Sequence, residues 1–266
     1  MISFLVACAI DAGGHIPIPE RMPHSLPLPP PLAQLAQGSP VALFLDFDGT
    51  LVDIAPRPDA IFVPDGLAAG LAALAERLEG RLALISGRAI SDIERHTGRL
   101  AIACAGSHGA DMRDAAGRPM GDPPAPFSPE LLGTLESFAT GRGLMVERKP
   151  HGAALHYRHD PTLEDESLAF ASALAAAQGL DIKRGKCVIE LVGKGANKGA
   201  AVAAFMAAAP FVGALPVFVG DDVTDEDGFR VAVEQGGFGL MVGDRQPTIA
   251  RYRLAHPAAV HHWLQL

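Results

Sequence analysis

The sequence of 266 residues is poor in cysteine and in aromatic residues, with three cysteines, one tryptophan and two tyrosines. Cys8, Cys104 and Cys187 share no spacing typical of a metal site, and their odd number reveals no disulfide framework. Because disulfides are rare in the reducing cytosol, we expect free structural thiols in a cytoplasmic protein.

Basic residues are also few. Lys and Arg total 22 against 30 Asp and Glu, which gives a net charge of −8 and a pI near 5.6. Binding an extended nucleic acid needs a basic face, so we exclude nucleic acid as a partner and expect a local cluster to meet any anionic ligand. Residues 1–10 are apolar, but this run is too short to span a membrane and lacks the basic start of a secretory signal. We therefore expect no membrane partner.

Proline, in contrast, is abundant before residue 41, where residues 22–31 read MPHSLPLPPP. Proline has no backbone N–H and a fixed φ, which argues against a regular helix or a central strand. We predict an extended, partly disordered leader over residues 1–40 that contributes nothing to catalysis. The folded part is expected to begin near Val41.

Residues 41–53 read VALFLDFDGTLVD, a short apolar run that leads into two carboxylates. Such a run is typical of a strand buried on both faces of a parallel sheet. Asp46 and Asp48 would then lie beyond the carboxyl end of that strand, where ligands bind in open α/β sheets. A simple turn, in which Asp48 caps its own backbone before Gly49, is the structural alternative.

The following segments alternate between helical stripes and short apolar strands. This alternation predicts right-handed crossovers and a doubly wound parallel sheet, an α/β core of Rossmann-like type formed by residues 41–113 and 193–266. Helices are expected over residues 66–79, 89–96 and 197–208, and strands over 82–85, 100–105, 215–219 and, as the last strand, 238–242.

Residues 114–192 have a different character. Helical stretches at 128–140 and 160–178 stand beside segments that alternate like two-faced strands, at 146–149 and 187–192. This mixture predicts a small α+β cap domain inserted into the core. Such insertions are tolerated because the ends of a domain often lie close together.

Four predicted strands end in polar residues. Because the carboxyl ends of parallel strands share one edge of the sheet, these residues should gather there. Crowded carboxylates repel one another unless a cation joins them, and oxygen ligands without cysteine or paired histidine favour Mg²⁺ over zinc. Phosphoryl chemistry is therefore the leading class of reaction. The residues concerned are Asp46, Asp48, Ser86, Arg88, His108, Asp221 and Asp222.

Four motifs resemble, in order, those of the haloacid dehalogenase (HAD) superfamily of phosphatases. Further stretches, GSHGADMR at 106–113, VERKP at 146–150 and HYR at 156–158, are similar to the trehalose-6-phosphate phosphatases. The resemblance covers about residues 41–242. The four motifs are DFDGTL (46–51), SGR (86–88), NKG (197–199) and GDDVTDED (220–227).

The resemblance implies a catalytic role for four residues. Asp46 would attack phosphorus and form an aspartyl-phosphate, and Asp48 would protonate the departing sugar oxygen and then activate water. Ser86 would bind phosphoryl oxygens. Lys198 would add its charge to that of a helix N-terminus and offset the charge of the transferring group.

The resemblance also implies a Mg²⁺ site. Asp46, Asp221 and the backbone carbonyl of Asp48 are expected as direct ligands. Asp222 is also included among the metal residues and would contact the ion through water or hold one of the direct ligands. Asp225 is expected to hydrogen-bond the ligands without contacting the ion.

Two lysines compete for the phosphate-binding role, Lys194 and Lys198. We favour Lys198 because it stands between Asn197 and Gly199, as in the family. The sequence departs from the family just before this motif, since residues 190–193 read ELVG where the family commonly has Glu-Leu-Arg-Pro. This departure concerns local substrate contacts and not the chemistry.

Glu147 and Lys149 share strand parity and so project to one face, which by itself indicates a solvated surface. The resemblance implies instead that they hydrogen-bond the hydroxyls of the distal glucose together with Glu190. For Arg88, pairing with a surface carboxylate is an open alternative; for His108, a place in the core is the alternative, although flanking glycines favour an exposed ring. The predicted substrate-binding residues are Arg88, His108, Glu147, Lys149, Arg158 and Glu190.

The resulting hypothesis is a Mg²⁺-dependent phosphatase that hydrolyses trehalose 6-phosphate, a small-molecule substrate, while the cap closes over it and excludes water. We expect a monomer. One alternative is a HAD phosphatase for another sugar phosphate, such as sucrose phosphate or a glycosylglycerate phosphate. The other is a catalytically inert regulatory homologue, which the intact set of Asp46, Asp48, Lys198 and Asp221 disfavours.

Overall fold

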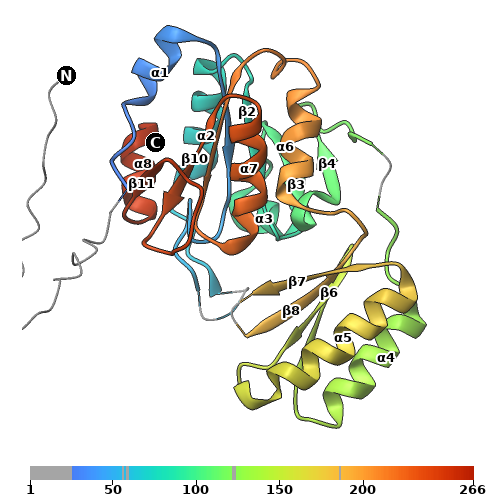
Figure 1. Ribbon diagram of the computed structural model, residues 1–266. Helices are drawn as coiled ribbons and strands as arrows, with labels where there is room; N and C mark the ends of the chain where they lie inside the picture. Colours follow the sequence, from blue (N-terminus) through green and yellow to red (C-terminus); the bar gives the residue numbers. More distant parts are fainter. Residues whose placement is uncertain (1–25, 56, 58–59, 122–123, 186) are drawn as a thin grey trace, which may run out of the picture.

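The computed structural model describes residues 26–266 apart from 56, 58–59, 122–123 and 186. The described chain forms a larger core and a smaller cap, and the chain passes from core to cap and back (Figure 1). Within this part of the chain, no helix combines the length and the apolar character that a membrane crossing requires.

The core is built on a seven-stranded sheet in the order β11-β10-β9-β1-β2-β3-β4. Neighbouring strands run parallel except β4, which is antiparallel to β3. This confirms the predicted α/β class with a mostly parallel sheet. The strands are β1 Val41–Leu45, β2 Leu82–Ile85, β3 Ala103–Gly106, β4 Asp111–Arg113, β9 Leu215–Gly220, β10 Phe238–Val242 and β11 Tyr252–Leu254.

Helices cover both faces of this sheet, which explains why the sequence of the central strand β1 is apolar throughout. Val41, Leu43 and Leu45 pack with α2, α3 and α8 on one face, whereas Ala42 and Phe44 pack with α6 and α7 on the other. A central strand covered on both sides has no position for a polar side chain. The helices are α2 Leu67–Arg77, α3 Ile90–Thr97, α6 Lys198–Met206, α7 Glu226–Glu234 and α8 Pro257–Leu264.

The cap is a four-stranded antiparallel sheet in the order β5-β6-β8-β7 with two helices on one face. Leu155, Ile189 and Leu191 of the sheet pack against Leu135 and Ala171 of these helices. The opposite face of the sheet is turned toward the core (Figure 1). The range 114–192 stays the proposed extent of the cap domain. Its elements are α4 Pro129–Thr140, β5 Met145–Lys149, β6 Gly152–His156, α5 Glu164–Gln178, β7 Asp181–Gly185 and β8 Val188–Val192.

The described end of the predicted leader is ordered against the core and contains a helix, which corrects the expectation of extended chain. Helix α1, Leu32–Gly38, begins directly after Pro31 and itself contains no proline, so nothing interrupts its hydrogen bonds. Trp263 Nε1 donates to the carbonyl of Pro30 at 2.9 Å, and Arg253 N to that of Pro27 at 3.0 Å. Residues 1–25 of the predicted leader lie outside the described residues.

Three strands differ from the expectation. Strand β11 follows β10, so 238–242 is not the last strand; with three residues it is too short to show alternation. Strand β4 is equally short, and β7, with the sequence DIKRG, has no apolar run because it lies at the edge of the cap sheet. These strands form through pairing with their neighbours, which sequence periodicity does not report.

Replacing Phe44 by Ala is expected to lower the free energy of unfolding by about 3–5 kcal/mol, because this fully buried ring packs against Phe205 and Phe211 and its loss leaves a cavity. Phe62 is 79% exposed and provides the matched control, since Phe62→Ala should change stability by less than about 0.5 kcal/mol. Urea denaturation of the two variants measures the difference. Coincident unfolding curves would contradict the assigned core.

Candidate active site

The carboxyl ends of β1 and β9 carry the acidic residues of the candidate active site. Asp46 follows β1 directly and is buried, and its backbone N–H donates to the carbonyl of Val219 at 2.9 Å. Gly49, in the turn after β1, has a φ of 79°, and a Cβ there would lie 2.1 Å from Asp221 Oδ2. Because only glycine combines this φ with so close an approach, it allows the turn to lie against Asp221.

Lys198 is an enclosed cation at this edge, with 3% of its side chain exposed. It opens α6, where the N-cap Asn197 accepts the backbone N–H of Ala200 at 2.7 Å. Its Nζ donates to Asp46 Oδ1 at 2.7 Å and to Asp225 Oδ1 at 2.6 Å. Burial alone would lower the pKa of Lys198, but the charges of Asp225 and Asp46 raise it above its ordinary value. The charged lysine therefore joins two carboxylates from separate loops.

Asp225 fixes the loop that follows β9. Its side chain is wholly buried, and Oδ2 accepts the backbone N–H groups of Asp221 at 2.9 Å and Asp222 at 2.8 Å. Asp222 is exposed and caps the 3₁₀ turn Val223–Asp225. The sequence predicts Asp222 among the metal residues and Asp225 further out, whereas the turn directs Asp225 inward and leaves Asp222 at the surface.

Three carboxylates lie close enough to share a cation: Asp46, Asp221 and Asp225 each offer an oxygen within 4.8 Å of the others. Burial, followed by the charge of Asp225, raises the pKa of Asp221 to about 7. Burial also raises the pKa of Asp46, against the lowering effect of Lys198. Asp221 Oδ1 is buried and has no hydrogen-bond partner among the described residues. Oxygen ligands with excess negative charge are a donor set that suits a hard cation.

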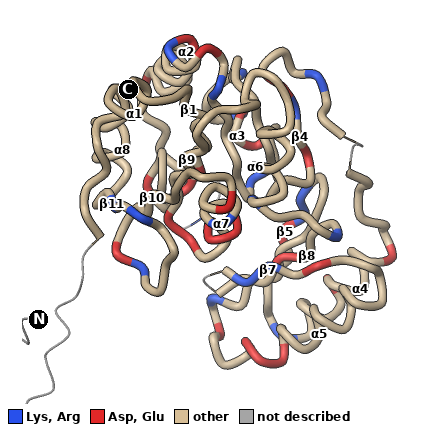
Figure 2. Tube along the Cα trace, turned by 45° about the horizontal axis from the view of Figure 1, so that its top comes forward, with Lys and Arg blue, Asp and Glu red and all other residues tan. Residues whose placement is uncertain are grey.

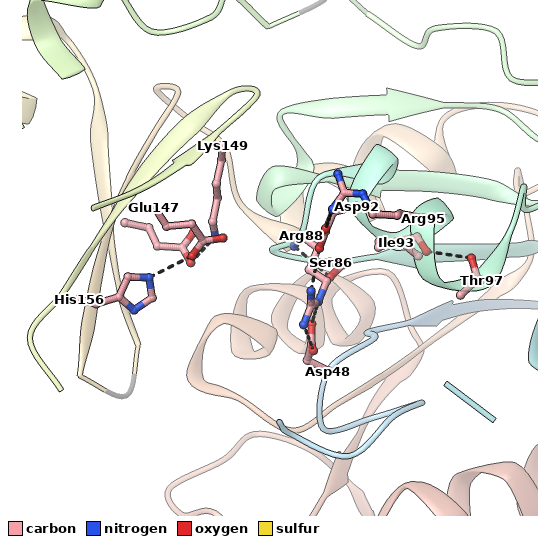
Figure 3. A network of polar contacts seen from close by, with 11 residues as sticks. Asp48, Ser86, Arg88, Asp92, Ile93, Arg95, Thr97, Glu147, Lys149 and His156 are labelled. Carbon is pink, nitrogen blue, oxygen red and sulfur yellow. Dashed lines mark hydrogen bonds and ion pairs between the residues drawn. The ribbon is translucent and has the colours of Figure 1, made fainter. Parts of the chain in front are cut away.

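Ser86 and Arg88 follow β2 at the same edge of the sheet. Ser86 is buried, and its Oγ accepts the backbone N–H of Arg88 at 3.1 Å. The Arg88 side chain forms a fork with Asp48, Nε donating to Oδ2 at 2.6 Å and Nη2 to Oδ1 at 2.8 Å, while Nη1 donates to Asp92 Oδ2 at 2.7 Å (Figure 3). Of the two alternatives left open for Arg88, the structure contains the acidic pairing, and one of its partners is Asp48.

The cap sheet presents a polar face to these groups. Glu147, Ala154 and Glu190 lie opposite one another on β5, β6 and β8, and Lys149 shares their face. Lys149 Nζ donates to Glu190 Oε1 at 2.7 Å, and His156 Nε2 lies 3.0 Å from Glu147 Oε2. Figure 3 shows the side chains of Glu147, Lys149 and His156 on the side of the cap that faces the loop after β2.

His108 is buried, with 6% of the residue exposed, which corrects the expectation of an exposed ring. Its Nε2 lies 3.1 Å from Glu190 Oε2, so this residue of the core is covered by the cap. Burial would raise the pKa of Glu190, but the charge of Lys149 and the contact with His108 outweigh burial and lower it well below its usual range. Glu190 is therefore a partly buried carboxylate held in its charged form.

Opposite charges also meet between core and cap away from His108. Lys183 Nζ on β7 lies 3.5 Å from Asp227 Oδ2 at the start of α7. In the view of Figure 2, acidic positions gather around the start of α7, and basic positions of β7 lie next to them. His151 Nε2 of the cap and Asp111 Oδ2 of the core lie further apart, at 3.9 Å.

Several residues near the site were not predicted from the sequence. Asp92 lies on α3 one turn after Arg88, a spacing of four that was a usable signal. His156 was visible only as part of the HYR stretch. Arg245, whose Nε donates to a backbone carbonyl of the loop after β9 at 3.3 Å, reaches the site from 24 residues away and gives no local signal. Arg158, which was predicted, is exposed beyond the end of β6.

The family model of the trehalose-phosphatases matches residues 44–258, most of the chain. The chain belongs to the trehalose-phosphatase family. It is 39% identical over 228 residues to trehalose-6-phosphate phosphatase of Escherichia coli (strain K12), an alignment that covers 85% of each protein. It is also 39% identical over 209 residues to a probable trehalose-phosphate phosphatase of Sinorhizobium fredii, covering 77% of this chain and 79% of the relative.

Solved structures agree with this assignment to the family. A trehalose-6-phosphate phosphatase related protein is 25% identical, with a TM-score of 0.66 over 85% of this chain and 95% of that chain. The C-terminal domain of trehalose-6-phosphate phosphatase from C. albicans shares the fold at 24% identity, with a TM-score of 0.73 and coverage of 90% and 96%. A phosphatase of the HAD superfamily from Bacteroides thetaiotaomicron shares it at 14% identity and a TM-score of 0.60, with coverage of 90% and 97%. This trehalose-phosphatase family member is thus a phosphatase with the HAD fold.

Replacing Lys198 by Met is expected to lower the free energy of unfolding by about 3–5 kcal/mol, because Asp46 and Asp225 remain buried without their cation. The loss should be larger at pH 8 than at pH 5, since burial raises the pKa of Asp46 and this carboxyl can bind a proton at low pH instead. Urea denaturation at both pH values measures this. Lys194, four residues earlier and exposed, provides the control, because Lys194→Met should change stability by less than about 0.5 kcal/mol. Similar effects of the two substitutions would contradict the ion-pair assignment.

Proposed function

We propose that this protein hydrolyses trehalose 6-phosphate to trehalose and inorganic phosphate. The observation that supports this most directly is the meeting of two sets of side chains: Asp46, Lys198 and Asp221 at the sheet edge, and Glu147 and Glu190 on the cap face turned toward them. The first set suits phosphoryl transfer and the second suits the hydroxyls of a sugar. The names of the relatives from Escherichia coli and Sinorhizobium fredii support the same substrate.

In the proposed first step, an Asp46 oxygen forms a bond to phosphorus as the bond between phosphorus and the sugar oxygen breaks. Asp48 supplies the proton that the departing oxygen needs. Lys198, already bound to Asp46 Oδ1, orients the nucleophile and offsets negative charge, and Ser86 offers its hydroxyl to a phosphoryl oxygen. In the second step, water attacks the phosphorus of the aspartyl-phosphate while Asp48 takes a proton from it, which releases phosphate and restores Asp46.

The contact between Arg88 and Asp48 affects both proposed steps. The fork of Arg88 donates to both oxygens of Asp48, and a bidentate contact of this kind with a guanidinium group favours the charged carboxylate. This arrangement suits Asp48 as the base of the second step. For the first step the fork must open so that Asp48 carries a proton, and we propose that Arg88 then turns to the phosphoryl group of the substrate.

We propose Mg²⁺ as the cofactor. The orphaned oxygen of Asp221 and the oxygen-only donors around it fit this ion. Asp46, Asp221 and the backbone carbonyl of Asp48 would hold it, with Asp225 binding Lys198 behind them. When bound, Mg²⁺ supplies positive charge for the phosphoryl oxygens.

On the cap, Glu147, Lys149 and Glu190 are the proposed partners of the sugar hydroxyls, and Arg158 would contribute from the end of β6. Charged residues with ordered partners suit this role because hydroxyls both donate and accept. Sucrose phosphate and glycosylglycerate phosphate are not favoured, because the relatives above are trehalose-phosphate phosphatases. A monomeric state and a cytoplasmic location stay predictions.

A phosphate-release assay with Mg²⁺ tests the substrate. We expect kcat/KM for trehalose 6-phosphate to exceed that for sucrose 6-phosphate, glucosylglycerate phosphate and glucose 6-phosphate by about tenfold or more, because the cap contacts are specific to the disaccharide. Asp46→Asn should lower turnover by about 10³-fold or more and keep the fold, as judged by circular dichroism. Asp53, an exposed carboxylate after the same strand, provides the control, and Asp53→Asn should stay within about twofold of the parent. A fully active Asp46→Asn enzyme would refute the mechanism.

The cofactor proposal predicts that Mg²⁺ stabilises the protein more at pH 8 than at pH 5.5. The pKa of Asp221 is raised from 3.8 to about 7 in the folded protein without metal, so ionisation of Asp221 costs stability as pH rises through this range. Below pH 7 the ion must displace a proton, whereas above it the carboxylate is free to bind. Tm measured with Mg²⁺ and with a chelator at both pH values tests this. In Asp221→Asn the pH dependence of the Mg²⁺ effect should become smaller, with Asp46, whose pKa burial also raises, as the remaining carboxylate ligand; an equal Tm shift at both pH values in the parent would contradict the proposal.

A further inference from the structure

His108 lies where core and cap meet, and its loop is bound to the loop after β2. The backbone N–H of His108 donates to the carbonyl of Ser86 at 2.9 Å, and that of Ser107 to the carbonyl of Arg88 at 2.8 Å. A Cβ on Gly87 would lie 2.7 Å from His108 Cε1, so only glycine fits against the imidazole ring. The loop of residues 86–88, which positions the side chains of Ser86 and Arg88, therefore also sets the position of the His108 ring.

The backbone at this point is strained. Ser107 has a φ of 50° and His108 a φ of 58°, and both lie in the left-handed region that residues other than glycine seldom adopt. Two such residues in succession persist only where the surrounding structure imposes them, and sites of this kind are often functional. Here the strained turn directs the ring of His108 toward Glu190, 3.1 Å away on the cap.

Glu190 is held from two sides. Lys149, which belongs to the cap, donates to Oε1 at 2.7 Å, and His108, which belongs to the core, lies 3.1 Å from Oε2. Because a carboxylate only accepts, Nε2 of His108 must carry the proton in this contact. The Lys149 contact can persist wherever the cap moves, but the His108 contact exists only while the cap covers the core.

We propose that His108 is a positioning residue that couples closure of the cap to recognition of the sugar. It orients Glu190 for a sugar hydroxyl only when the cap is closed over the phosphate site. Its backbone bonds to the loop of Ser86 and Arg88 set the distance between the sugar end and the phosphate end of the substrate. This inference rests on the proposed function, because it assigns the sugar-binding role to Glu190.

The experiment compares two substrates and two variants. His108→Asn shortens the side chain but tolerates the left-handed backbone, which asparagine adopts more readily than most residues. We expect kcat/KM for trehalose 6-phosphate to fall about tenfold or more, as for loss of a hydrogen bond to a charged group. Turnover of p-nitrophenyl phosphate, a monoester without a sugar, should fall clearly less than turnover of trehalose 6-phosphate, because this substrate makes no contact with Glu190. His108→Gln, whose amide can still donate to Glu190, should recover part of the loss.

The outcomes separate coupling from a general structural effect. An equal loss on both substrates, or no loss on trehalose 6-phosphate, would overturn the proposal. His262, exposed on α8, provides the control, and His262→Asn should leave both activities unchanged. In a double-mutant cycle with Glu190→Gln, the second substitution should add little to the first if the two side chains act together, whereas additive losses would count against coupling.

A failure of the proposed function would look different. If the parent enzyme turns over p-nitrophenyl phosphate but not trehalose 6-phosphate, the substrate assignment fails. The coupling is then measured on the sugar phosphate of the panel that turns over fastest, with the same ratio to p-nitrophenyl phosphate. Hydrogen exchange at residues 193–197, where the chain returns from the cap, gives an independent readout: faster exchange in His108→Asn than in His262→Asn supports looser closure, and equal exchange contradicts it.

Discussion

The arrangement of the site depends on one buried cation. An ammonium group that is 3% exposed is stable only with partners, and Lys198 has two, Asp46 and Asp225. Asp46 ends β1, Asp225 lies in the turn after β9, and Lys198 starts α6, so three separate elements are fixed relative to one another by two ion pairs. Asp225 also binds the backbone of Asp221, which places a second carboxylate beside the first. The crowding of negative charge at this edge is therefore built around the lysine.

Four strands of the core sheet and the role of Lys198 could be predicted because the residues that indicate them are close together in the sequence. The short apolar runs predict β1, β2, β9 and β10 correctly, since strands covered on both faces cannot include polar residues. Lys198 was distinguished from Lys194 by its place between Asn197 and Gly199, as in the family, and Asn197 caps the helix that Lys198 opens. The elements α1, β4, β7 and β11 were missed because their own residues carry too little pattern: β4 and β11 have three residues each, β7 has no apolar run, and α1 follows a proline-rich stretch.

The details of the site could not be predicted because they depend on tertiary contacts. Asp222 and Asp225 are equivalent as carboxylates in the sequence, and only the turn that one of them caps decides which is buried. His108 and Glu190 are 82 residues apart, and whether the histidine is exposed depends on the cap lying over it. The pairing of Arg88 with Asp48 spans 40 residues. Motifs predicted which residue types gather, but not which of them contact one another.

The loop after β2 links the two halves of the molecule more closely than its length suggests. The side chain of Arg88 holds Asp48, while its carbonyl and that of Ser86 hold the strained turn that carries His108. A displacement of this loop would therefore move Asp48 and His108 together. Because Gly87 leaves no space between loop and imidazole, the two movements cannot be taken up independently. The carboxylates of the core and the polar face of the cap are thus joined through three consecutive residues, which explains why a site assembled from two sheets can be held to one geometry.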